Sequence, residues 1–354
     1  AHTDRLRAAV ARIADTLGWP VLIDGASCLR GGERLPGALY VGDCLARSER
    51  LAARLAPELI VRIGQIPTSS PLRQMLATHG AERTLLLDAT GQRHDPDGLN
   101  AEVLIGDPAR TLEALSVRLS MKGHELDPTW IQTWSRAAEA LAPDHQPQTI
   151  DEPLWSGSTA KLIAETLPEG GLLHLASSLA VRTFDAFAGP TQAAVQVTAN
   201  RGVNGIDGTL ATSFGQSAAW SGPVAVLIGD LAFLHDLGSL ATQAASWDGP
   251  PWVCVVLDNQ GGGIFDHLPI ANHPSAYEAH FVTPQKVDLP RIAHPLVSTC
   301  VSVSTPGALR AELIQAFTRP EITVLHVPFN RDLDMKQHQG AWAWGTKAAE
   351  EAIS

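Results

Sequence analysis

Two oxygen-bearing side chains and a run of glycines follow two apolar stretches in the second half of the chain. The apolar stretch at 224–228 leads into Asp230, and the stretch at 252–257 leads into Asn259 and the glycine triplet 261–263. The two polar residues are about 30 residues apart, which fits one strand–helix–strand unit. We therefore expect both side chains at the carboxyl ends of neighbouring parallel strands, where open α/β sheets bind ligands.

These residues suit a divalent cation. Asp230 offers a carboxylate, Asn259 an amide oxygen and Gly261 a backbone carbonyl, which are the oxygen ligands that Mg²⁺ prefers. The glycines would also let a phosphate group come close to backbone N–H groups. The alternative, a strand end followed by an ordinary helix N-cap, accounts for Asp230 alone but not for the second strand and its glycines. Asp258 and Gln260 are expected to be loop residues rather than ligands.

The elements that must position these residues alternate between short apolar runs and helical patterns, which is typical of parallel sheets covered by helices. We predict an α/β fold of two doubly wound parallel-sheet domains, a central domain at 1–147 and a diphosphate-binding and Mg-binding domain at 148–354. The polar segment 122–152 is the predicted linker between them.

The pattern of apolar residues gives approximate bounds for these elements. Strands are predicted at 20–23, 38–41, 58–63, 84–88, 103–105, 171–175, 194–197, 224–228, 252–257 and 322–327, and helices at 4–17, 48–56, 71–78, 111–119, 130–141 and 347–353. A short element is also expected around Trp342 and Trp344 in the polar tail.

Composition narrows the class of ligand. The formal net charge of −11 argues against a nucleic-acid partner, because binding to a phosphate backbone needs clustered Lys and Arg. The four cysteines show no CxxC spacing, so neither a zinc site nor a disulfide framework is implied. No apolar stretch reaches the length of a membrane span, and no signal sequence is evident. We expect a cytoplasmic protein with a small-molecule ligand.

Three sequence words carry a resemblance to a known family. They are Gly-Asp-Leu-x-x-Leu-x-Asp-Leu at 229–237, Asn-x-Gly-Gly-x-Ile-Phe at 259–265 and Asn-Arg-Gly-x-x-Gly-Ile-Asp-Gly at 200–208. The first two resemble the metal and diphosphate motif of the thiamin-diphosphate enzymes. All three together resemble the MenD-type synthases of menaquinone biosynthesis. The resemblance is strong from Leu172 to Leu268 and weaker before it.

The resemblance implies roles for residues at the matching positions. The metal would be held by Asp230, Asn259 and Gly261, and the cofactor by Ile206, Gly229, Leu231, Ala232, Gly262, Gly263 and Ile264. The substrates would be held by Ser178, Arg182, Arg201, Phe265 and Leu268. The alternatives are an ordinary core position for Ile206, Phe265 and Leu268, and a solvated surface position for Arg182.

The resemblance also implies an activity. With thiamin diphosphate and Mg²⁺ or Mn²⁺, such a synthase decarboxylates 2-oxoglutarate and adds the product to isochorismate, giving 2-succinyl-5-enolpyruvyl-6-hydroxy-3-cyclohexene-1-carboxylate. The family is homo-oligomeric, a dimer or a tetramer. Its activating glutamate lies on an N-terminal pyrimidine-binding domain. We expect this chain to lack that domain and the first strand of the central domain, and to be inactive alone.

Two other functions stay open from the sequence. One is a different thiamin-diphosphate carboligase or decarboxylase acting on another 2-oxo acid. The substrate candidates Arg182 and Arg201 argue against a small monocarboxylate, which needs fewer cations. The other is a non-catalytic module derived from such an enzyme, because an intact metal motif does not establish turnover.

Overall fold

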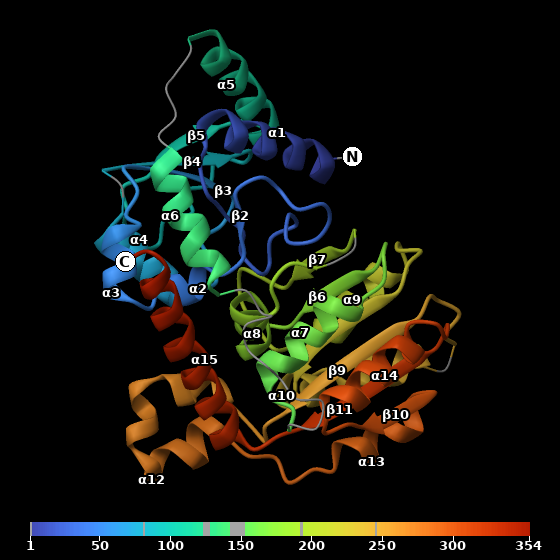
Figure 1. The fold of residues 1–354 in the computed structure, drawn as a ribbon. Helices are drawn as coiled ribbons and strands as arrows, with labels where there is room; N and C mark the ends of the chain where they lie inside the picture. The colour runs from blue at the N-terminus through green and yellow to red at the C-terminus, as the bar shows by residue number, and fades with distance from the viewer. Residues whose placement is uncertain (1, 81, 123–127, 142–152, 192–193, 245) are drawn as a thin grey trace. The chain divides into compact units, whose positions relative to one another are not determined.

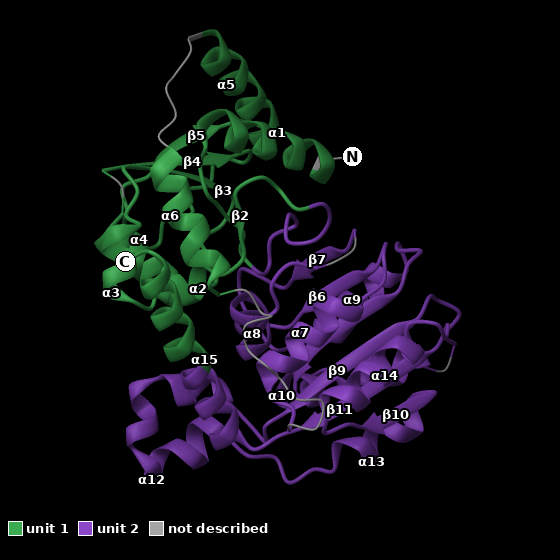
Figure 2. Ribbon diagram, viewed as in Figure 1, with its two compact units in different colours: residues 1–24, 34–145, 341–354 green, residues 25–33, 146–340 purple. Residues whose placement is uncertain are grey.

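The computed structural model describes residues 2–80, 82–122, 128–141, 153–191, 194–244 and 246–354. They form two compact units, which Figure 2 distinguishes by colour. Unit 1 comprises residues 1–24, 34–145 and 341–354, and unit 2 comprises 25–33 and 146–340. Within the predicted linker, the helical piece is α6 (Pro128–Glu139), and residues 123–127 and 142–152 lie outside the described residues.

Unit 2 is built on a six-stranded parallel sheet. Its order across the sheet is β10-β11-β9-β8-β6-β7 (Figure 1). The strands are β6 (Leu172–Leu175), β7 (Gln196–Ala199), β8 (Val224–Gly229), β9 (Trp252–Asp258), β10 (Thr299–Ser302) and β11 (Ile322–Pro328). From β6 the chain runs to β7 on one side and then to β8 on the other, which makes the β6–β8 boundary the switch point where such sheets bind ligands.

Helices cover both faces of this sheet, as expected for a doubly wound fold. On one face, α7 (Ser156–Thr166) packs against α8 (Leu179–Phe187) and α14 (Pro306–Ala316). On the other lie α9 (Thr209–Ser217), α10 (Asp230–His235), α11 (Leu237–Ala244) and α13 (Leu289–Ala293). The short elements η2 (Gly263–His267), η3 (Pro269–Asn272), α12 (Pro274–Tyr277), η4 (Glu278–Val282) and η5 (His294–Leu296) link β9 to β10.

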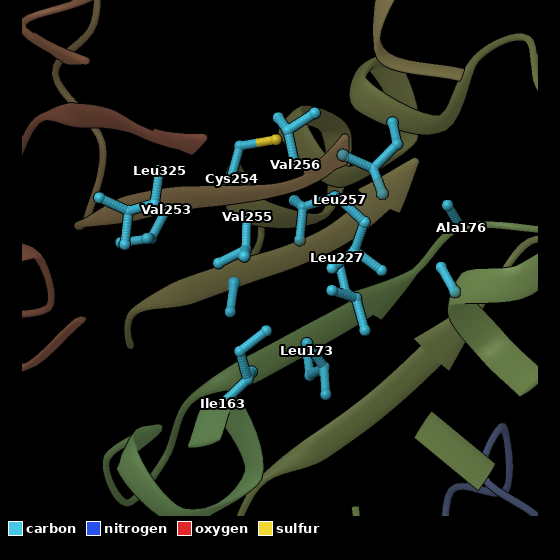
Figure 3. Close-up of a cluster of buried hydrophobic side chains, with 14 of the residues drawn as sticks. Ile163, Leu173, Ala176, Leu227, Val253, Cys254, Val255, Val256, Leu257 and Leu325 are labelled. Atoms are coloured by element: carbon cyan, nitrogen blue, oxygen red, sulfur yellow. The ribbon is translucent and has the colours of Figure 1, made fainter. Parts of the chain in front are cut away.

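The core of unit 2 explains why its strands read as unbroken apolar runs. Residues 224–228 and 252–257 are all buried, because helices cover both faces of the sheet. Figure 3 shows side chains of these strands, including Leu227, Val253 and Val255, beside Ile163 of α7. This rigid layer carries the loops at the carboxyl ends of the strands.

Residues 25–33 join unit 2 from far upstream through the buried Arg30. Its Nε donates to the Gly189 carbonyl at 3.0 Å, and its Nη1 lies 3.7 Å from Asp185 Oδ1. The Gly25 amide donates to the same oxygen of Asp185 at 2.6 Å. Gly31 lies so close to the backbone that a Cβ there would be 1.8 Å from the Val195 carbonyl oxygen. This segment therefore holds the carboxyl end of α8.

Unit 1 contains two small parallel sheets. One pairs β1 (Val21–Leu22) with β2 (Ala38–Leu39), and the other has the order β3 (Leu59–Ile63), β4 (Arg83–Asp88), β5 (Glu102–Ile105). Its helices are α1 (His2–Leu17), α2 (Gly42–Leu45), α3 (Glu49–Arg54), α4 (Ser70–Thr78), α5 (Pro108–Lys122) and α6. Its core gathers Leu45, Leu51, Leu55, Met75 and Trp134.

The structure confirms the predicted α/β class and corrects several bounds. β7 begins two residues later than the predicted strand 194–197, and β10 was not predicted. In place of a short element near Trp342 and a separate terminal helix, one helix, α15 (Arg331–Ala352), spans the tail. Within the described part of the chain, no helix has the length and apolar character of a membrane span.

Candidate functional site

The predicted site residues come from the loops at one edge of the six-stranded sheet. Ser178 follows β6, Arg201 and Ile206 follow β7, Asp230 follows β8, and Asn259 follows β9. Because these strands are parallel and adjacent, their carboxyl ends share one edge. The topology thus brings the predicted residues to the switch-point edge.

Asp230 and the glycine turn are joined by a hydrogen bond. Asp230 is the first residue of α10 and is 4% exposed. Its Oδ2 accepts a hydrogen bond from the Gly261 amide at 2.7 Å, and its Oδ1 accepts one from the Leu231 amide at 2.7 Å. In the sheet, Gly229 lies opposite Leu257. The two predicted motif halves therefore meet as the spacing implied.

The charge of Asp230 is poorly compensated by the protein. Burial and the neighbouring carboxylate of Asp258 raise the pKa of Asp230 to about 7. Burial also acts on Asp258, but its hydrogen bond with His326 and the Gln260 amide lower the pKa of Asp258 overall. Among the described residues, no Lys, Arg or His forms an ion pair with Asp230. A bound cation would supply the missing positive charge.

The glycine turn is shaped by close backbone contacts. Gly261 has a φ of +140°, and a Cβ on it would lie 2.3 Å from the Val282 carbonyl oxygen. A Cβ on Gly262 would lie 2.5 Å from the Phe281 carbonyl oxygen, and the Gly262 amide donates to Val282 at 2.8 Å. Side chains at these positions would displace the turn.

The donor set fits a mixed oxygen site. In the described ranges, no three His, Cys, Asp or Glu residues gather as a metal cluster. The oxygen donors that the two loops offer are the Asp230 carboxylate, the Asn259 amide and the Gly261 carbonyl. The Gly261 oxygen accepts from the Gly263 amide at 2.9 Å and keeps a second lone pair. Mg²⁺ commonly binds in this way, with few protein ligands and with substrate phosphates.

The two arginines predicted for substrate are both half-buried. Ser178 is the N-cap residue of α8 and has a φ of +69°, and Arg182 Nη1 donates to the Ser178 carbonyl oxygen at 2.6 Å. Arg182 therefore folds back toward the start of its helix. Arg201 has a buried Nη1 atom that makes no hydrogen bond within the described chain. Such a guanidinium nitrogen suits an anionic ligand.

The remaining predicted residues differ in exposure. Ile206 packs against the main core, Phe265 meets Phe281 edge-on with ring centroids 5.4 Å apart, and Leu268 is 49% exposed. Among the cofactor candidates, Gly262, Gly263 and Ala232 are buried, whereas Gly229, Leu231 and Ile264 are half-buried. Their roles toward cofactor and substrate stay predictions.

The sequence analysis did not identify two polar residues near this edge, His326 and Ser302. His326 Nε2 lies 2.8 Å from Asp258 Oδ2, and His326 Nδ1 lies 2.9 Å from Ser302 Oγ. A signal was present, because His326 is the one ionisable residue inside the largely apolar run 322–327. Asp258, expected in a loop, is the last residue of β9.

Comparison with known proteins relates this chain to a domain family and to named enzymes. Residues 188–327 match the family model of the thiamine pyrophosphate enzyme C-terminal TPP-binding domain. The chain is 33% identical to a 2-succinyl-5-enolpyruvyl-6-hydroxy-3-cyclohexene-1-carboxylate synthase of Sorangium cellulosum, over 91% of this chain and 53% of that protein. It is 38% identical to the synthase of the same name from Rubrobacter xylanophilus, over 78% of this chain and 47% of that protein.

A solved structure supports the fold. An enzyme from Mycobacterium smegmatis assigned as thiamin diphosphate-dependent is 18% identical, with a TM-score of 0.59 over 93% of this chain and 60% of that chain. The chain spans about half the length of the curated relatives that it matches. Residues 188–327 are thus similar to the TPP-binding domain of the thiamine pyrophosphate enzymes, and the curated relatives named here are 2-succinyl-5-enolpyruvyl-6-hydroxy-3-cyclohexene-1-carboxylate (SEPHCHC) synthases.

Proposed function

We propose that this chain anchors thiamin diphosphate and a divalent cation, Mg²⁺ or Mn²⁺, in a SEPHCHC synthase. The observation that carries the proposal is the environment of Asp230. Its carboxylate is buried, lacks a cationic partner among the described residues and contacts the Gly261 amide. Together with Asn259 and the Gly261 carbonyl, it offers the oxygen donors that such a cation takes.

Each part of the site has a task in this proposal. Asp230, Asn259 and Gly261 hold the cation, and Gly262, Gly263 and the first turn of α10 leave room for the diphosphate. Ile206 supports the rings of the cofactor. When bound, thiamin diphosphate supplies the electron sink that decarboxylation of a 2-oxo acid needs. The chain contributes binding, orientation and charge.

The substrates in this proposal are 2-oxoglutarate and isochorismate. Both carry more than one carboxylate, and guanidinium groups bind carboxylates well. Arg201 and Arg182 are half-buried at the carboxyl edge of the sheet, which suits that task. Ser178, Phe265 and Leu268 would complete the contacts. We further propose that the enzyme is cytoplasmic and works as a homo-oligomer.

Product formation tests this proposal. The chain is incubated with thiamin diphosphate, Mg²⁺, 2-oxoglutarate and isochorismate, alone and together with the separately produced N-terminal half of a curated relative. We expect CO₂ release and SEPHCHC, detected by mass spectrometry, in the complemented reaction. Turnover of pyruvate but not 2-oxoglutarate would instead favour another carboligase. Cofactor binding without turnover of any 2-oxo acid would favour a non-catalytic module.

A further inference from the structure

Polar side chains on three neighbouring strands form a hydrogen-bonded row that leads to the proposed cation site. Ser302 of β10 and His326 of β11 lie directly opposite each other, and Ser302 Oγ is 2.9 Å from His326 Nδ1. His326 Nε2 is 2.8 Å from Oδ2 of Asp258, which ends β9. His326 pairs with Val256, so Asp258 lies two residues further along β9, on the same face of the sheet.

Asp230 stands at the end of this row. Gly229 of β8 lies opposite Leu257 of β9, and the residues that follow them are Asp230, the first residue of α10, and Asp258, the last residue of β9. Two carboxylates therefore occupy adjacent positions at the carboxyl edge, and only Asp258 has a histidine partner among the described residues. The row thus ends beside the expected metal ligand.

The hydrogen-bond roles within the row follow from its chemistry. An ionised Asp258 can only accept, so the His326 Nε2–H must donate to it. In a neutral ring, Nδ1 is then an acceptor, and the Ser302 hydroxyl must donate. Ser302 therefore selects the ring tautomer that donates to Asp258.

Asp258 also holds the turn that carries the other two cation ligands. Its Oδ1 accepts from the Gln260 amide at 3.0 Å, while the next amide, that of Gly261, donates to Asp230 Oδ2 at 2.7 Å. Two consecutive amides of the turn are thus held by two different carboxylates. Asn259 lies between Asp258 and these amides.

We propose that Asp258, held by His326 and Ser302, is a positioning residue of the cation site. It fixes the turn that presents Asn259 and the Gly261 carbonyl, and it adds negative charge beside the cation without binding it. Residues that orient metal ligands in this way often matter nearly as much as the ligands. This inference rests on the proposed function, because it assumes that the cation binds at Asp230.

Uptake of Mn²⁺ in the presence of thiamin diphosphate tests the row without any need for turnover. Electron paramagnetic resonance counts the free Mn²⁺ while the full chain is titrated. Asp258→Asn and His326→Leu should each weaken Mn²⁺ binding by about 10–100-fold. His326→Gln should retain most of the affinity, because its amide can still donate to Asp258. Ser302→Ala should have a smaller effect in the same direction.

A matched pair of residues in the same sheet serves as the control. His174 Nδ1 of β6 lies 3.0 Å from Thr198 Oγ1 of β7, with the same kind of contact between neighbouring strands. Thr198→Val removes a hydroxyl from a histidine ring, as Ser302→Ala does. It should lower the melting temperature without changing Mn²⁺ affinity, because this pair does not contact the glycine turn.

Each outcome decides the inference. Wild-type affinity in folded Asp258→Asn and His326→Leu would overturn the positioning role while leaving the proposed cofactor site intact. If His326→Leu does not fold, Asp258→Asn and Ser302→Ala decide in the same way. A loss in Thr198→Val as large as that in Ser302→Ala would make the effect a general loss of stability. A wild-type chain that takes up no Mn²⁺ with thiamin diphosphate would refute the cofactor site, and the inference with it.

Discussion

The carboxyl edges of the parallel sheets in the two units carry aspartates with opposite electrostatics. Asp88 ends β4 in unit 1, and Asp230 follows β8 in unit 2. Asp88 Oδ1 accepts from the amide of Thr90 at 2.8 Å and from its hydroxyl at 2.6 Å, and these bonds keep the pKa of Asp88 below its ordinary value. The pKa of Asp230 is instead raised to about 7, chiefly by burial.

Two other aspartates near this edge of unit 1, Asp97 and Asp95, also have hydrogen-bond donors. Arg73 donates to both carboxylate oxygens of Asp97, and this contact lowers the pKa of Asp97. Asp95 accepts from the amides of Leu99 and Ala101. The position of an aspartate at a strand end is therefore shared by both units, whereas the unbalanced charge is found at Asp230. That imbalance, more than the position, supports the cation site that we propose at Asp230.

The largest expected effect tests this comparison directly. Asp230→Ala should abolish Mg²⁺-dependent binding of thiamin diphosphate, because it removes the full negative charge assigned to the metal shell. Asp88→Ala should leave that binding unchanged. Isothermal titration calorimetry of both variants measures the difference. Equal affinity of Asp230→Ala and wild type for thiamin diphosphate would contradict the distinction between Asp230 and Asp88.

The next effect removes a buried charge from unit 2. Arg30→Ala removes the guanidinium that donates to the Gly189 carbonyl and lies beside Asp185, and should cost about 3–5 kcal/mol of unfolding free energy in unit 2. Urea unfolding followed by tryptophan fluorescence measures it. Arg5→Ala is the control, because Arg5 pairs with Glu113 at an exposed site and should matter far less. A similar small loss in both variants would contradict the importance of burial.

A smaller effect concerns the arginines at the edge of unit 2. Arg201→Ala and Arg182→Ala should each cost about 2–4 kcal/mol of transition-state stabilisation, as expected for loss of a charge-assisted contact. The complemented assay gives kcat/KM for each substrate. Arg73→Ala, whose guanidinium is already bound to Asp97, should leave kcat/KM unchanged. Losses confined to thiamin diphosphate affinity would exclude the substrate role.

The smallest effect is the pH dependence of the unfolding free energy that Asp334, a buried aspartate of unit 2, should cause. Asp334 accepts from the Ser156 amide at 2.8 Å, and burial raises the pKa of Asp334 from 3.8 to about 6. A raised pKa in the folded state gives a contribution to stability that is complete below pH 3.8 and lost as the pH rises to about 6. Asp334→Asn stays neutral, so its stability relative to wild type should rise by about 2–3 kcal/mol across that range.

Thermal unfolding between pH 4 and 7 checks this sign. When the scan is extended below pH 3.8, Asp88→Asn should show the opposite trend, because a lowered pKa stabilises the folded state above the ordinary pKa and loses that effect as the pH falls. Parallel pH curves for Asp334→Asn and wild type would contradict the assignment.

The sequence predicted most reliably those elements that are buried on both faces. β8 and β9 read as apolar runs, and the spacing of Asp230 and Asn259 placed both at one edge. β10 was missed because this edge strand is only partly buried and carries polar residues. The contact of His326 with Asp258 could not be predicted, because β11 inserts between β9 and β10, and this order across the sheet differs from the order in the chain.

The segment that carries Arg30 has a consequence for the time course of synthesis. Arg30 precedes Asp185 by 155 residues, so it leaves the ribosome on the order of 10 s before its partner at usual rates of translation. During that interval, α8 has not yet been made, and the early guanidinium remains hydrated. Unit 2 can therefore complete its folding only after residues 146–340 have been made and have bound the segment 25–33, which is synthesised much earlier. A domain expressed from residue 146 onward would lack the Arg30 guanidinium.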